Sequence, residues 1–222
     1  MRNTGCLIAG LFCLTMLLGC QSSSSSELVF HTIDTDFSKG RLSHEQIITL
    51  QDLEKFHGHL CDGLVVGALA MQQAMASLYP NEPIDRTNLR IASKPSPCLT
   101  DVAIYLTDGR YHFNTFYVDT AFKGLYMIQR IDNLETVSVS LNQGVKPDEI
   151  DSLGNIAIQQ ELPPCEIDHL KKLEDDFMET LIQSEANTLY TINEVLNFEW
   201  NPRTKNDYLK TDILNKNLED CN

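Results

Sequence analysis

The sequence predicts a single domain of the α+β class, in which helices pack against an antiparallel sheet. Three observations predict this class. The 222 residues, 42% of them hydrophobic, are enough for one sizeable core. Segments with helical periodicity flank a stretch of alternating segments in the middle of the chain. The connections between the alternating segments are short, which favours antiparallel pairing.

The first half of the chain is expected to contain two helices. Apolar residues recur at spacings of three and four over 47–56, and Gly58 should end this first helix. A second helix is expected over 62–79, where small residues would let a neighbouring element pack closely. Residues 27–45 are polar and mixed in character, and we expect them to form an irregular lead-in.

The middle of the chain is expected to supply the sheet. A short strand is expected over 88–93, followed by a helix over 98–107, whose apolar residues fit positions i, i+3, i+4 and i+7. Three β-prone segments follow at 111–119, 125–131 and 136–141. These segments should pair antiparallel and form the sheet.

The last third returns to helical patterns. A turn and a short helical segment are expected within 147–154, and an amphipathic helix carries its apolar positions between Ile167 and Leu181. Residues 186–222 are polar and form a C-terminal extension. This extension either packs through Phe198 and Trp200 or is loosely ordered.

The charge balance excludes one class of partner. Lysine and arginine total 17 and aspartate and glutamate 31, which gives a formal net charge of −14. A chain this acidic is repelled by phosphate backbones, so no nucleic-acid partner is expected. Metal cations are among the partners that such a charge favours.

The N-terminus has the features of a secretory leader. Residues 1–19 combine a positive start with an apolar run that is short for a membrane span. The run ends Leu17-Leu18-Gly19-Cys20, which resembles a bacterial lipobox, and by that resemblance Cys20 is lipidated. Residues 20–44, which begin with Cys20 and a run of serines, are then expected to form a flexible tether. We therefore expect a lipid-anchored extracytoplasmic protein of the bacterial cell envelope, periplasmic or on the surface; an ordinary signal peptide with a chance cysteine is the alternative.

Four further cysteines belong to the mature chain: Cys61, Cys98, Cys165 and Cys221. An extracytoplasmic compartment permits disulfides. Four cysteines allow three pairings, and the sequence does not choose among them.

One segment carries a dense set of metal-ligand residues. His57, His59 and Cys61 occupy alternate positions, so in extended backbone their side chains would converge. Imidazole nitrogen and thiolate sulfur suit Zn²⁺ or another transition metal. Three protein ligands would leave a coordination position for water or substrate, as in catalytic zinc sites.

Cys98 and Asp101 are the candidate catalytic residues. Both lie near the start of the helix expected over 98–107, and one turn of helix places their side chains on one face. Cys98 could be a fourth ligand or a nucleophile, and Asp101 could orient a metal-bound histidine. Simpler interpretations are that His57 is a hydrogen-bonded histidine at a helix end and that Cys61 and Cys98 form a structural disulfide or pack in the core.

Two motifs together resemble the E-subunit family of formylmethanofuran dehydrogenase over residues 45–185. The first is Phe56-His57-Gly58-His59-Leu60-Cys61, with Gly63 and Gly67 on the following helix; the second is Cys98, Asp101, Thr107 and Gly109. The family usually has proline after the motif cysteine, where this chain has Asp62, and both residues suit a helix start. The family also often has a lysine after its second motif, and Lys123 falls near that position, which makes it a pocket candidate.

The resemblance implies an α+β core, a homodimer, and a metal site built from these histidines and cysteines. It does not imply formylmethanofuran oxidation, because that reaction needs a pterin-bound metal and iron–sulfur clusters carried by other subunits. Three hypotheses stay open: a metal-dependent enzyme, a non-catalytic metal- or ligand-binding lipoprotein, and a structural disulfide with no metal.

Overall fold

The computed structural model describes residues 28–205, 215, 218, 219 and 221. Within them, the α-helices are α1 (Leu50–His57), α2 (Asp62–Leu78), α3 (Pro97–Thr107), α4 (Asp148–Ile158), α5 (Pro164–Gln183) and α6 (Ala186–Leu189). The strands are β1 (Val29–Asp34), β2 (His44–Thr49), β3 (Ile84–Asp85), β4 (Leu89–Ser93), β5 (Phe116–Val118), β6 (Tyr126–Arg130), β7 (Thr136–Leu141) and β8 (Tyr190–Glu194). Short 3₁₀ helices lie at Asp36–Ser38 and Tyr111–Phe113.

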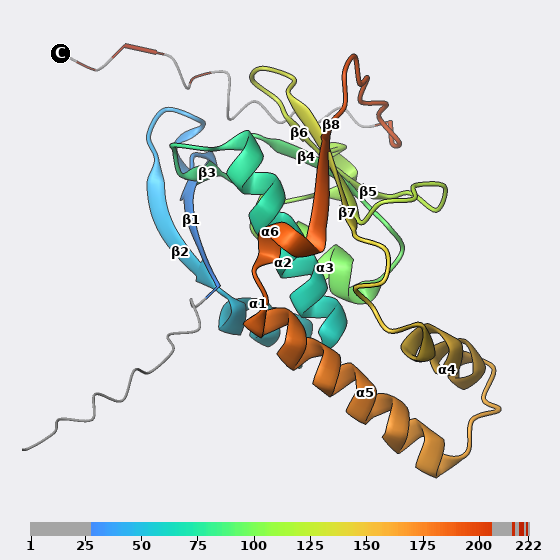
Figure 1. Ribbon diagram of the computed structural model, residues 1–222. Helices are drawn as coiled ribbons and strands as arrows, with labels where there is room; N and C mark the ends of the chain where they lie inside the picture. The colour runs from blue at the N-terminus through green and yellow to red at the C-terminus, as the bar shows by residue number, and fades with distance from the viewer. Residues whose placement is uncertain (1–27, 206–214, 216–217, 220, 222) are drawn as a thin grey trace, which may run out of the picture.

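The strands form two sheets around a central helix. The larger sheet has the order β5-β4-β6-β7-β8, and the smaller has the order β2-β1-β3. Figure 1 shows α2 in the middle of the molecule, with the small sheet on one side and the large sheet on the other. Most strand pairs are antiparallel, so the predicted α+β class and the single domain are confirmed.

Helix α2 is the centre of the core because it is apolar on almost every side. Most of its side chains are buried, which is typical of a helix enclosed by other elements. Gly67 lies in its middle, where a Cβ atom would come within 2.6 Å of the hydroxyl oxygen of Tyr126. That hydroxyl donates a hydrogen bond of 3.0 Å to the carbonyl of Leu99. Gly67 thus lets α2, α3 and β6 meet closely.

The first helix begins later than its periodicity predicts. The expected helix over 47–56 is wrong at its start, because Ile47 and Ile48 belong to β2. Ile48 is buried and Ile47 is exposed, which is the alternation of a strand. Thr49 then starts α1 with a capping box, in which its side chain accepts from the Asp52 backbone and Asp52 accepts from the Thr49 backbone.

Two further expectations about secondary structure are wrong. The described part of the lead-in expected over 27–45 contains β1, which pairs antiparallel with β2 and parallel with β3. The strand expected over 111–119 is confined to β5, and β5 pairs parallel with β4 rather than antiparallel. In both cases the strand forms through pairing with another segment, to which local periodicity gives no signal.

The C-terminal extension packs on the sheet. Strand β8 adds to the edge of β7, and Trp200 lies against Tyr117, with ring centroids 4.7 Å apart. The indole nitrogen of Trp200 donates a hydrogen bond of 2.6 Å to the carbonyl of Asn114. Packing, rather than loose ordering, is therefore observed for the extension up to residue 205.

Cys20 and the leader 1–19 lie outside the described residues. Among the helices that the structure describes, none is both long enough and apolar enough to cross a membrane.

Candidate metal centre

The candidate ligands lie where α1 passes into α2. His57 is the last residue of α1, and Gly58 ends that helix with a left-handed φ of 101°, a conformation that glycine adopts without strain. The chain then extends to Cys61, which caps the start of α2 by accepting a hydrogen bond of 3.4 Å from the Leu64 backbone. A helix end, a glycine turn and a helix cap therefore fix the positions of the candidate ligands.

These elements bring three ligand atoms together. One atom each from His57, His59 and Cys61 lies within 4.8 Å of the other two, so the cluster could hold a metal ion. The two imidazole rings are 4.7 Å apart between centroids. The three side chains converge as expected. They do so because the chain turns at Gly58, and not because the backbone is extended throughout.

The separation of nitrogen and sulfur fits a tetrahedral metal ion. Nε2 of His57 lies 3.8 Å from Sγ of Cys61. Zinc bonds of about 2.0 Å to nitrogen and about 2.3 Å to sulfur, at a tetrahedral angle, place these two atoms about 3.6 Å apart. The donor set of two imidazoles and one thiolate is one that zinc and similar transition metals accept.

Asp101 orients His57. Its Oδ2 lies 2.8 Å from Nδ1 of His57, whose side chain is 6% exposed. Because an ionised carboxylate only accepts hydrogen bonds, Nδ1 carries the proton and Nε2 is left with a lone pair that points to the cluster. Burial lowers the pKa of His57, but the hydrogen bond to Asp101 and the nearby Cys61 sulfur raise it more, so the net direction is upward.

Packing between α1 and α3 positions this carboxylate. The rings of Phe56 and Tyr105 lie 5.2 Å apart between these two helices. Ser96 caps α3 and Pro97 occupies its first turn, which fixes the direction of the helix. Asp101 therefore reaches His57 across an interface that is held by other side chains.

Cys98 is adjacent to the cluster without being a member of it. Its Sγ lies 3.5 Å from Sγ of Cys61, and both cysteines are free thiols in the structure. The hydrogen bond from the Cys98 thiol, followed by the Leu64 backbone N–H, lowers the pKa of Cys61 to about 5. The same hydrogen bond raises the pKa of Cys98. Cys61 is therefore the thiolate of the pair, and Cys98 is its hydrogen-bond donor.

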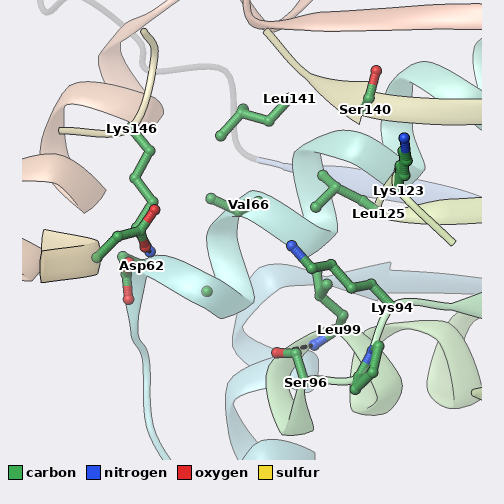
Figure 2. A pocket seen from close by; sticks show the side chains of 14 residues that line it. Asp62, Val66, Lys94, Ser96, Leu99, Lys123, Leu125, Ser140, Leu141 and Lys146 are labelled. Carbon is green, nitrogen blue, oxygen red and sulfur yellow. Dashed lines mark hydrogen bonds and ion pairs between the residues drawn. The ribbon is translucent and has the colours of Figure 1, made fainter. Parts of the chain in front are cut away.

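A cavity of about 380 Å³ is lined by residues from the first turn of α2 and the start of α3, the segments that carry the two thiols. Gly63 and Ser96, each two residues from one of the thiols, belong to its lining. A Cβ atom on Gly63 would come within 2.8 Å of Sγ of Cys98, so the start of α2 packs closely against that sulfur. Figure 2 shows the cavity with Lys94 and Lys123 among the side chains that surround it. Lys123 was predicted as a pocket residue from the sequence, but Lys94 was not. Lys94 lies outside any motif, so nothing in the sequence distinguishes it from other lysines.

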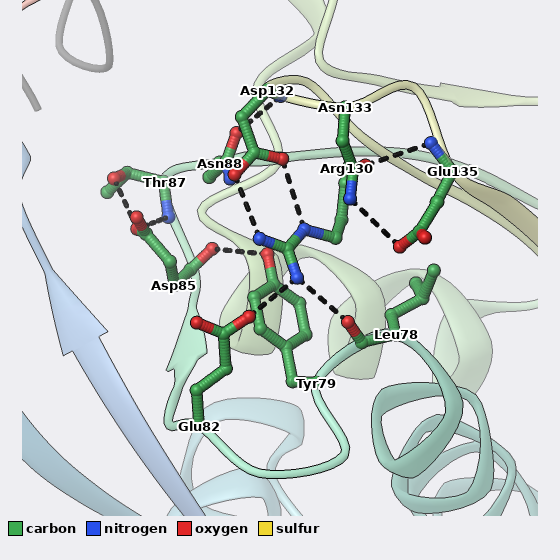
Figure 3. A network of polar contacts seen from close by, with 10 residues as sticks. All are labelled: Leu78, Tyr79, Glu82, Asp85, Thr87, Asn88, Arg130, Asp132, Asn133 and Glu135. Carbon is green, nitrogen blue, oxygen red and sulfur yellow. Dashed lines mark hydrogen bonds and ion pairs between the residues drawn. The ribbon is translucent and has the colours of Figure 1, made fainter. Parts of the chain in front are cut away.

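A second polar cluster lies away from the thiols and has a structural role. Arg130 donates to the carbonyl of Leu78 at 2.9 Å and to carboxylate oxygens of Glu82 and Asp132 at 2.7 and 2.8 Å (Figure 3). Its guanidinium also lies 4.4 Å from the centre of the Tyr79 ring. These contacts of Arg130 join the end of α2 to β6.

Comparison with known proteins identifies the same region. A family model described as "FmdE, Molybdenum formylmethanofuran dehydrogenase operon" matches residues 56–191. The match covers more than half of the chain and runs from the first residue of the motif into β8. It therefore includes His57, His59, Cys61, Cys98 and Asp101. No curated protein matches the chain.

Proposed function

The chain belongs to the FmdE family, and on that premise we propose that it is an extracytoplasmic, zinc-dependent enzyme that acts on a small substrate. His57, His59 and Cys61 would hold the ion. The observation that carries the proposal is the convergence of these three ligand atoms within 4.8 Å. Three protein ligands with a free fourth position are the arrangement of catalytic zinc, whereas structural zinc has four protein ligands.

The residues around the cluster have separate roles in this proposal. A bound zinc ion would supply Lewis acidity to polarise a substrate oxygen. Asp101 is a positioning residue, because its hydrogen bond to Nδ1 fixes the orientation of His57 and the availability of Nε2. Cys98 is a second positioning residue, because its thiol lies 3.5 Å from the Cys61 sulfur and donates a hydrogen bond to it.

A non-catalytic role in metal handling is the second candidate function. The observation that favours it is the 3.5 Å distance between the two sulfur atoms. A small movement of Cys98 would make it a fourth ligand and close the coordination sphere, which is typical of a carrier or structural site. If Cys98→Ser retains metal, the open site is supported; if it loses metal as Cys61 variants do, the closed site is supported.

Removal of one histidine tests the proposed metal site. The His59→Ala variant is expected to lose most of its metal, because the two remaining ligands cannot close around the ion. His44→Ala removes a histidine of β2 outside the cluster and should retain wild-type metal content. Elemental analysis of protein purified without chelators measures the stoichiometry, and thermal unfolding of the same samples measures stability.

The two measurements separate the outcomes. The proposal predicts that the variant loses metal and stays folded at a somewhat lower unfolding temperature, because the bound metal stabilises the folded state but the fold has its own hydrophobic core. Equal metal content in the wild type and both variants would rule out the cluster. Loss of metal together with global unfolding would make the site structural, and the enzyme proposal would fail.

The cellular location belongs to the same proposal and is supported by the leader sequence alone. Lipidation at Cys20 would anchor the protein to a membrane of the bacterial envelope, and a homodimer follows from the family resemblance. Cys20→Ser is expected to release the protein into the soluble fraction, because a serine oxygen cannot form the thioether. Fractionation of cells that express wild type and variant measures this. Tight membrane association of the variant would contradict the lipid anchor.

A further inference from the structure

We propose that the cavity lined by the starts of α2 and α3 binds a small organic anion with an apolar body, such as a short aliphatic carboxylate, through Lys94 and Lys123. The inference names a substrate class for the proposed enzyme. It rests on the proposed function only in treating this anion as the substrate, because binding by itself needs no metal. Four features of the cavity support it: its size, its apolar walls, its cationic groups, and its position.

The cavity has the size and the lining of a ligand site. Its volume of about 380 Å³ falls within the range of small-molecule pockets, and its lining mixes aliphatic side chains with charged and polar ones. The apolar part of the lining comes from α2, α3, β7 and the chain just before β6. These residues are Val66, Leu99, Leu125 and Leu141. Such walls suit a short hydrocarbon chain.

The cationic groups at this cavity are unusual for so acidic a chain. Lys94, Lys123 and Lys146 all line it, whereas the whole protein has a formal charge of −14. Lys146 is already paired with Asp151 at 2.6 Å. Neither Lys94 nor Lys123 has a carboxylate partner among the residues that the structure describes. Two ammonium groups at one cavity are therefore available to an anion.

The two ammonium groups point to different parts of the cavity. Figure 2 shows Lys94 extending between Val66 and Leu125, toward the middle of the cavity, while Lys123 points toward Ser140. Asp62, the cavity's other carboxylate, lies on the Lys146 side of the view, away from Lys123. An anionic head is therefore expected to contact Lys94 in the middle of the cavity or Lys123 beside Ser140, with the hydrocarbon chain against the aliphatic side chains.

The position of the cavity connects this ligand with the metal cluster. The first turn of α2 and the cap of α3 line it, and these segments also carry Cys61 and Cys98. The positive ends of both helix dipoles therefore lie near the cavity and favour an anion there. Gly63 in the first turn of α2 belongs to the lining, so the ligand site and the thiols share this segment of the chain.

Hexanoate is the probe that tests the inference. The neutral analogue 1-hexanol has a similar length but no charge, and acetate has the carboxylate but almost no hydrocarbon chain. Binding is followed by ¹H–¹⁵N NMR at the amides of Gly63 and Gly124, which line the cavity. We expect hexanoate to saturate with a dissociation constant of order 1 mM, a value that ligand efficiency permits for so small a molecule. Hexanol and acetate should each bind at least about fivefold more weakly, since each lacks one part of the interaction.

Charge-neutral variants assign the anion contact to the lysines. Lys94 and Lys123 are exposed, so Lys94→Gln and Lys123→Gln should each weaken hexanoate binding by up to about fivefold, the upper end for an exposed ion pair. Lys172→Gln makes the same change of charge on α5, where Lys172 pairs with Asp176, and should leave the affinity unchanged. Two lysine variants are used so that a folding defect in one does not decide the result.

The outcomes for this inference and for the metal site are distinguishable, because metal content is measured on the same samples. Hexanoate binding that is no stronger than hexanol binding, or that is unaffected by both lysine variants, would overturn the anion pocket. Absence of saturation up to about ten times the expected constant would also overturn it. Selective hexanoate binding by a wild type that holds no metal would instead contradict the proposed enzyme and leave the anion pocket standing.

Discussion

The Cys61→Ser variant is expected to lose metal affinity by at least about 100-fold while it stays folded. Loss of a hydrogen-bond partner of a ligand typically costs about 10–100-fold, and loss of the ligand itself should cost more. Serine is also a good helix cap, so it can replace the sulfur as acceptor for the Leu64 backbone N–H. The substitution thus separates the ligand role of Cys61 from its structural role at the start of α2.

Competition with a chelator of known affinity measures this effect. Cys165→Ser is the matched control, because Cys165 is an exposed cysteine at the start of α5 and lies outside the cluster. It should keep wild-type affinity. Similar affinities for wild type and Cys61→Ser would mean that sulfur does not bind the metal, and the assigned ligand set would be wrong.

The Gly67→Ala variant is expected to lower the free energy of unfolding by about 1–3 kcal/mol, a typical cost of overpacking a core. Its new methyl group would lie 2.6 Å from the Tyr126 hydroxyl oxygen and 3.1 Å from a methyl carbon of Leu99. Tyr126 is fully buried, so its ring cannot move away freely. Displacement of this hydroxyl would also weaken its hydrogen bond to the start of α3, the helix that carries Cys98 and Asp101.

The same substitution elsewhere should have the opposite sign. Gly154 lies inside α4, and a Cβ atom there would meet nothing within 4 Å. Gly154→Ala should therefore raise the free energy of unfolding by about 0.5–1 kcal/mol, the helix preference of alanine over glycine. Chemical denaturation of both variants measures the difference. Stabilisation by Gly67→Ala would show that α2 and α3 are not packed as described.

The parts of the fold that were predictable from sequence are those with strong local signals. Helix α2 follows its apolar residues almost to the residue, and Pro80 lies just beyond its end. Helix α3 follows its i, i+3, i+4, i+7 pattern behind a proline start. In both helices the periodicity and the boundary residues agree, so local preference and tertiary packing select the same structure.

The parts that were missed depend on distant partners. Strand β8 forms because β7 offers a free edge, and β5 pairs parallel with β4 across the whole of α3. In β2, the neighbouring Ile47 and Ile48 match a helical pattern as well as a strand, and only pairing with β1 decides between them. Short segments with ambiguous periodicity are decided by tertiary contacts.

The candidate site was predictable in its ligands but less so in its surroundings. His57, His59 and Cys61 stand out because they are close in sequence. His57 and Asp101 are 44 residues apart in the sequence. Asp101 could be proposed as a partner of a histidine only because it follows Cys98 by one turn of helix. Lys94 has no such marker, because the cavity that it lines exists only once the sheet and α2 are assembled.

X-ray absorption at the zinc edge tests the central claim most directly, because it reports the atoms bound to the metal. For protein loaded with one equivalent of zinc, we predict one sulfur neighbour at about 2.3 Å and nitrogen or oxygen neighbours at about 2.0–2.1 Å. The sulfur contribution should vanish in Cys61→Ser. A spectrum with no sulfur neighbour, or one that is identical in wild type and Cys61→Ser, would contradict a metal centre built from His57, His59 and Cys61.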